Sequence, residues 1–221
     1  MEARPRIRTL GAVIPADLVP KGCRWPIVLG IDPGTRAMGY GALVVAPEGP
    51  RFVACGVLAP HARAPVAQRL AEIQVELVEL LAALRPGVLA LERAFHSKNA
   101  QAAFRIGEAR GVVLAAAARV GIEILELAPA AAKKAVLGHG AASKEQVARM
   151  IAHLLGTGPL SVPTDATDAL ALALACVKRL TSPLRSVPAR RSSPLLRGSS
   201  GLPMAAHGHA RKEGRRSGER R

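Results

Sequence analysis

The chain has 221 residues, of which 49% are hydrophobic and 2% aromatic, so Ala, Val and Leu must fill most of its core. A chain of this length can bury a substantial core, and no uncharged apolar run approaches the roughly 20 residues of a membrane span. The three cysteines, Cys23, Cys55 and Cys176, lack C-x-x-C spacing. A zinc site or a disulfide framework is therefore not expected. The cysteine pattern instead favours a reducing cytoplasmic compartment. The formal net charge of +15 favours an anionic polymer as partner.

Much of this positive charge lies near the ends of the chain. Residues 178–221 carry 12 Lys or Arg against two Glu, and residues 1–26 carry five basic residues against two acidic ones. The segment 182–221 is rich in Arg, Ser, Pro and Gly and has almost no periodic apolar pattern, which predicts a disordered basic tail. Residues 1–26 contain four prolines and are expected to form a flexible extension. The folded domain is expected over 27–181, and the charge does not by itself indicate that this domain contacts nucleic acid.

Between these ends, apolar patterns of strand and helix alternate. The expected elements, in chain order, are strands over 27–32, 38–46 and 51–58, a helix over 70–84, a strand over 88–92, a helix over 99–119, a strand over 122–127, and helices over 129–137, 143–155 and 164–180. Ser143 and Gln146 have the spacing of a capping box. An antiparallel meander followed by alternating helices and strands predicts an α/β fold, with a five-stranded mixed sheet flanked by helices.

Two of the expected strands end in a carboxylate. Asp32 follows the apolar run 27–31, and Glu92 follows the apolar run 88–91. A charge at the end of a buried strand is costly unless it is paired or binds a metal ion. Taken alone, Asp32 could be a turn residue and Glu92 could pair with a nearby cation. Two such carboxylates in one sheet are more specific, because ligands gather at the carboxyl ends of strands.

Two further acids open the last expected helix. Asp165 and Asp168 are three residues apart and therefore share one helix face. Acids in a first turn commonly stabilise the helix dipole, which is the simpler explanation for the pair. However, the segment 169–177 is apolar on almost all sides and predicts a buried helix, so these acids need partners.

Together, the four carboxylates form a candidate metal site with oxygen ligands only. Such ligands favour Mg²⁺ or Mn²⁺ over zinc. Two such ions about 3.5–4 Å apart can hydrolyse a phosphodiester without a side-chain nucleophile. Because clustered carboxylates repel one another, they should bind metal well only when they are ionised.

With these acids in place, the sequence resembles the RuvC family of crossover junction endodeoxyribonucleases. The similar segments are 31–35 (IDPGT), 39–41 (GYG), 91–95 (LERAF), 98–99 (KN), 107–111 (GEARG) and 164–171 (TDATDALA). A lone Asp-Pro-Gly-Thr is a weak motif, but this ordered set spans about 27–177 and is strong.

The resemblance implies an RNase H-like fold and a cytoplasmic, nucleoid-associated homodimer that acts in recombination and repair. The implied activity is resolution of four-way (Holliday) DNA junctions by paired symmetric nicks, with two Mg²⁺ ions per site and Mn²⁺ as a substitute. It implies that Asp32, Glu92, Asp165 and Asp168 are the catalytic metal ligands. The RuvA and RuvB branch-migration proteins are the implied partners.

The resemblance also implies three DNA-binding residues. Phe95 would stack on an unpaired base of the opened junction, although it could also be an ordinary buried Phe. Lys133 and Lys144 match basic positions near the cleaved strand and could contact phosphates or offset charge. Lys144 also fits a solvated helix start, and Lys134 could replace Lys133.

Three alternative functions remain open. The first is an RNase H-like nuclease with another substrate. The second is a non-catalytic binder of DNA structures, which the complete acidic set disfavours because carboxylates without metal repel phosphates. The third is an ATP-binding protein of the actin and sugar-kinase type, for which the domain over 27–181 is too short and has no second phosphate motif.

Overall fold

The computed structural model describes residues 27–93, 100–138, 143–158 and 161–182. Within these ranges, all ten expected elements are confirmed in the expected order. No helix among them is long and apolar enough to cross a membrane.

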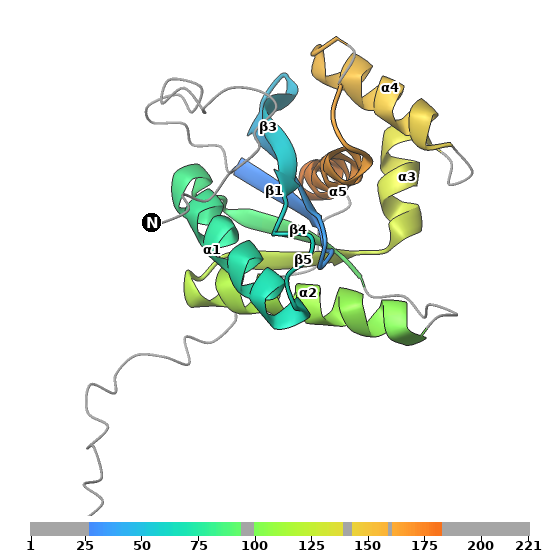
Figure 1. The fold of residues 1–221 in the computed structure, drawn as a ribbon. Helices are drawn as coiled ribbons and strands as arrows, with labels where there is room; N and C mark the ends of the chain where they lie inside the picture. Colours follow the sequence, from blue (N-terminus) through green and yellow to red (C-terminus); the bar gives the residue numbers. More distant parts are fainter. Residues whose placement is uncertain (1–26, 94–99, 139–142, 159–160, 183–221) are drawn as a thin grey trace, which may run out of the picture. The chain divides into compact units, whose positions relative to one another are not determined.

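A five-stranded mixed sheet lies at the centre of the fold (Figure 1). Its strands are β1 (Ile27–Asp32), β2 (Met38–Ala46), β3 (Gly49–Leu58), β4 (Val88–Glu92) and β5 (Glu123–Leu127). The order across the sheet is β3-β2-β1-β4-β5. The first three strands pair antiparallel, whereas β4 pairs parallel with both β1 and β5. The predicted mixed sheet is therefore confirmed.

Five helices cover the two faces of this sheet (Figure 1). They are α1 (Val66–Leu84), α2 (Ala100–Arg119), α3 (Pro129–Leu137), α4 (Lys144–Leu155) and α5 (Thr164–Thr181). Helices α1 and α2 share one apolar core with the sheet, and α3, α4 and α5 share a second core on the opposite face. Helix α1 begins earlier than predicted, directly after Pro65, because the buried position of its first turn is occupied by Arg69, a charged residue that interrupts the apolar period.

Side-chain alternation along β1 divides its residues between these two cores. Leu29 and Ile31 lie in the core with α1 and α2, whereas Val28 lies in the core with α5. Gly30 and Asp32 are two and four positions after Val28, so they lie on the same face of the strand and face α5. In β4, Val88 and Ala90 also belong to the α5 core, so Glu92 faces the same helix.

Helix α5 lies almost in contact with the backbone of the sheet because three glycines make room for it. A Cβ atom added to Gly30 would lie 2.0 Å from the Ala169 carbonyl oxygen, and one added to Gly39 would lie 2.0 Å from the Asp165 carbonyl oxygen. At Gly41 the same atom would meet Leu170 at 2.7 Å. Real Cβ atoms do not come this close, so the three glycines set the distance between α5 and the sheet.

Gly39→Ala should therefore displace α5 and destabilise the fold. We expect a loss of about 1–3 kcal/mol in the free energy of unfolding, because the new methyl group meets backbone that cannot move away alone. Urea denaturation followed by circular dichroism measures this loss. Unchanged stability would show that α5 is not held at this distance.

Candidate metal centre

Asp32 and Glu92 lie next to each other at the carboxyl-terminal ends of two neighbouring strands, β1 and β4. Strands β1 and β4 are parallel neighbours, and Ile31 is paired with Leu91, so the next residue of each strand is its terminal acid. Both acids face α5, as the strand parity requires. The charge of Glu92 is one of the causes that raise the pKa of Asp32.

Helix α5 brings its two acids to the same edge. Gly39 is the partner of Asp32 in the β1–β2 ladder, and it is also the glycine that touches the backbone of Asp165. The first turn of α5 therefore begins beside the end of β1. Asp168 is one turn further along and shares the helix face of Asp165.

The electrostatics of Asp32 reflect this gathering of acids. Burial, together with the charges of Glu92, Asp168 and Asp165, raises the pKa of Asp32 to about 7, and Lys144 partly opposes the rise. Burial and Asp168 also raise the pKa of Glu92. The four predicted ligands thus form one electrostatically coupled cluster, which a bound cation would relieve.

Lys144 supplies positive charge at this cluster. Its Nζ atom lies 2.9 Å from a carboxylate oxygen of Asp168, and this hydrogen bond raises the pKa of Lys144. The lysine is the first residue of α4, and the predicted capping box is confirmed: Ser143 and Gln146 satisfy each other's backbone N–H groups. The helix start therefore fixes the backbone from which Lys144 reaches Asp168.

The donor set suits a hard divalent cation, because all four side chains offer carboxylate oxygens. Among the described residues, no three acidic, His or Cys side chains already converge as a metal cage. Lys144 engages one carboxylate oxygen of Asp168.

Two predicted DNA-binding residues are not described in the same detail. Phe95 lies in 94–99, outside the described residues. Lys133 lies on α3, and its side chain is likewise outside the described part of the chain. Their predicted roles remain predictions.

Sequence reasoning missed two buried arginines near the acids, Arg69 on α1 and Arg110 on α2. Arg69 could have been found, since it stands on the apolar stripe of α1 with Ile73 and Leu77. A charged residue in such a stripe needs a polar partner. Arg110 lies within the GEARG segment but had no predicted role.

The fold and its acidic edge define a class of protein, the RNase H-like nucleases. Comparison with known proteins narrows this class. The family model for crossover junction endodeoxyribonuclease RuvC matches residues 28–176. The chain belongs to this RuvC family.

Individual relatives agree with this assignment. A crossover junction endodeoxyribonuclease RuvC from Pelodictyon phaeoclathratiforme is 40% identical over 190 residues, which is 85% of this chain and 89% of the relative. The protein of the same name from an Anaeromyxobacter species is 47% identical over 169 residues, covering 75% and 79% of the two chains.

Solved structures agree as well. The structure of Thermus thermophilus RuvC is 33% identical, with a TM-score of 0.63, and covers 70% of this chain and 95% of that one. A structure of the same protein in complex with a Holliday junction substrate also has a TM-score of 0.63 at 34% identity, with 68% of this chain and 92% of that one covered.

The raised pKa of Asp32 gives a testable dependence of stability on pH. The folded protein binds the Asp32 proton more tightly than the unfolded chain, whose aspartate pKa is about 4. The free energy of unfolding should therefore fall as pH rises from about 4 to about 7. At pH 8 without metal, Asp32→Asn should raise it by roughly 1–3 kcal/mol, and the gain should vanish near pH 4. Thermal and urea denaturation over this pH range measure the effect.

Glu76→Gln is the matched control for this measurement. Glu76 lies on α1, across the sheet from the acids, and burial with Glu79 and Glu72 raises its pKa to about 7. The control should therefore also stabilise the protein at pH 8. We expect added Mg²⁺ to stabilise the wild type, and only Asp32→Asn should diminish that stabilisation. An equal Mg²⁺ response in Asp32→Asn and the wild type would contradict the placement of the metal at Asp32.

Proposed function

We propose that the protein is a metal-dependent endonuclease that resolves four-way DNA junctions by paired nicks, acting in recombination and repair. The observation that carries this proposal is the coupled cluster of Asp32, Glu92, Asp165 and Asp168 at the carboxyl edge of the sheet. Family membership supplies the reaction class, and a relative bound to a Holliday junction supports the substrate.

The four carboxylates are the proposed ligands of two Mg²⁺ ions, for which Mn²⁺ could substitute. The metal pair would supply an activated water and stabilise the leaving 3′ oxygen. The chain's own contribution is to hold two acids on rigid strand ends and two on a buried helix. Lys144 engages one oxygen of Asp168, which leaves the other oxygen for a metal ion. Lys144 would also contact a phosphate of the cleaved strand.

The remaining DNA contacts are proposed from the family resemblance. Phe95 would stack on a base exposed at the opened junction, and Lys133 would contact backbone phosphate. The basic tail 182–221 and the extension 1–26 would add affinity that does not depend on sequence. Residues 27–181 form the proposed nuclease domain.

A homodimer is proposed because paired nicks need two sites. Support comes from α2, on which Phe104 is 74% exposed and Ile106 is 41% exposed. Gly107 and Gly111 on the same helix have no other segment of the described residues within 4 Å of an added Cβ atom, so a second helix could approach closely. RuvA and RuvB are the proposed partners, and the nucleoid is the proposed site of action.

Cleavage of a synthetic four-way junction tests the proposed function. The wild type with Mg²⁺ should produce symmetric nicks and should cut flap and duplex DNA poorly. Asp32→Asn should lower the cleavage rate roughly 1,000-fold, because loss of a metal ligand costs several kcal/mol in the transition state. Junction affinity in gel-shift assays should be retained.

The matched control is Glu79→Gln, which neutralises an exposed acid of α1. It should cut at the wild-type rate. Normal cleavage by Asp32→Asn would refute the assignment of the site, and equal cutting of flap or duplex DNA would favour the alternative nuclease function.

Deletion of residues 182–221 tests the role of the tail. The truncated protein should bind junctions more weakly at low salt but cleave bound junctions at the wild-type rate. The slope of log K against log salt should become shallower by about 0.9 for each phosphate that the tail neutralises in the full-length protein. An unchanged slope would exclude the tail as a phosphate-binding segment.

A further inference from the structure

Two buried arginines lie behind the strand-end carboxylates. Arg69 on α1 is 8% exposed and Arg110 on α2 is 7% exposed. Both helices cover the face of the sheet opposite α5, whereas the carboxylates of Asp32 and Glu92 face α5. The arginines therefore approach the two strand ends from the side away from the metal centre.

Arg110 binds the end of β4. Its guanidinium donates to the backbone carbonyl of Glu92 and, at 2.7 Å, to a carboxylate oxygen of Glu126 on β5. Glu126 is paired with Leu91 in the β4–β5 ladder and shares its parity, so it faces α2. One side chain thus ties the backbone of Glu92 to the neighbouring strand.

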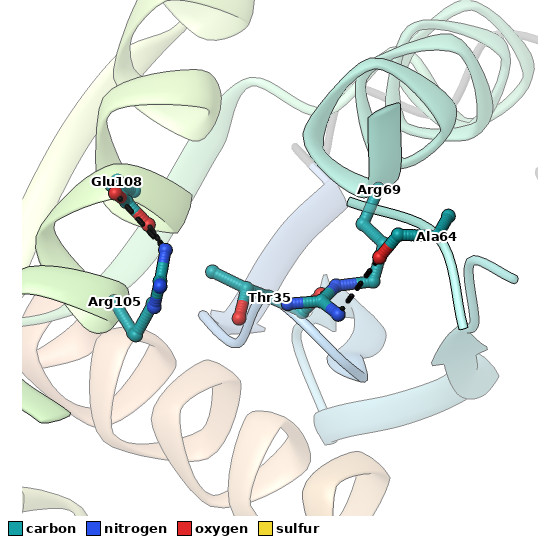
Figure 2. A network of polar contacts seen from close by, with 5 residues as sticks. All are labelled: Thr35, Ala64, Arg69, Arg105 and Glu108. Carbon is teal, nitrogen blue, oxygen red and sulfur yellow. Dashed lines mark hydrogen bonds and ion pairs between the residues drawn. The ribbon is translucent and has the colours of Figure 1, made fainter. Parts of the chain in front are cut away.

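Arg69 binds the turn that follows β1. Its Nε atom donates to the carbonyl of Thr35 at 3.0 Å, and its Nη1 atom donates to the carbonyl of Ala64 at 3.1 Å (Figure 2). Thr35 is buried and stands three residues after Asp32. The guanidinium therefore joins the turn after Asp32 to the loop that precedes α1.

We propose that Arg69 and Arg110 are positioning residues, which fix the backbone at the carboxyl ends of β1 and β4, from which Asp32 and Glu92 present their carboxylates to a metal ion. The proposal rests on the proposed metal centre. Fixed donors of this kind preorganise a site, since a ligand that must be ordered on binding lowers metal affinity.

Stability alone gives a weak account of these two arginines. Burying a guanidinium is costly, and well-packed apolar replacements of buried ion pairs are often neutral or stabilising. By contrast, Arg105 of α2 pairs with Glu108 at 3.1 Å on the exposed surface (Figure 2). Such exposed pairs contribute about 0–1 kcal/mol and fix nothing beyond themselves. Each buried arginine binds a carbonyl at or near a proposed ligand.

The test measures metal binding directly, so that it does not depend on the DNA substrate. Arg69→Met and Arg110→Met keep an unbranched apolar stem and remove the guanidinium donors. In titration calorimetry with Mn²⁺, each variant should bind about 10–100-fold more weakly than the wild type. The Mg²⁺ concentration for half-maximal junction cleavage should rise by a similar factor, while junction affinity without metal stays at the wild-type value. Arg63→Met, which replaces an exposed arginine beside Ala64, is the matched control and should change neither quantity.

Conservative variants separate positioning from folding. Arg110→Lys keeps a donor for the Glu92 carbonyl and should recover part of the lost Mn²⁺ affinity. Glu126→Gln alters a 40%-exposed side chain and should weaken Mn²⁺ binding by a smaller factor without unfolding the protein. If Arg110→Met does not fold, these two variants test the positioning role of Arg110 through their Mn²⁺ affinity. Arg69→Lys tests the role of Arg69 in the same way.

Wild-type Mn²⁺ affinity in a folded Met variant would overturn the role of that arginine. An equal loss of junction affinity and of metal affinity would also overturn it, since that pattern indicates general damage. Failure of the proposed function looks different: the wild type itself would then bind no Mn²⁺, or would leave four-way junctions uncut while the arginine variants still lowered metal affinity.

Discussion

The approach of α5 to three glycines of the sheet is the constraint on which the acidic site depends. A helix normally packs on a sheet through side chains, but here added Cβ atoms would lie 2.0–2.7 Å from helix atoms. The small side chains of α5 and the missing side chains of Gly30, Gly39 and Gly41 bring two backbones together. As a result, carboxylates from a helix start and from two strand ends reach one another across the layers of the fold.

This proximity raises the free energy of the ionised acids, and a bound cation would lower it. Burial and the charges of three other acids raise the pKa of Asp32 to about 7. Lys144 and Arg110 compensate for part of the negative charge at Glu92. Carboxylates placed this close together would destabilise an ordinary core. They are expected at a functional site, where charged groups are arranged to bind a ligand.

The sequence was sufficient to predict the order of elements, the mixed sheet and the two strand-end acids, because alternation and strand ends follow from local patterns. Family motifs assigned the same four acids a common role. The pairing of Lys144 with Asp168 was only partly foreseen, since it joins residues on two helices whose spacing no local pattern encodes. Arg69 and Arg110 had no predicted role because a backbone carbonyl, which every residue carries, leaves no trace in the sequence.

The parity of β1 has a consequence for how this part of the chain can change its length. One residue inserted between Ile27 and Asp32 would exchange the two faces of the strand, so that an acid would enter the core of α1 and α2 and an apolar side chain would enter the acidic cluster. The same change would remove Gly30 from beneath α5. Homologous strands should therefore tolerate many exchanges of apolar residues but keep the same number of residues. The number of residues in β1, more than their identity, determines on which face of the sheet its terminal acid lies.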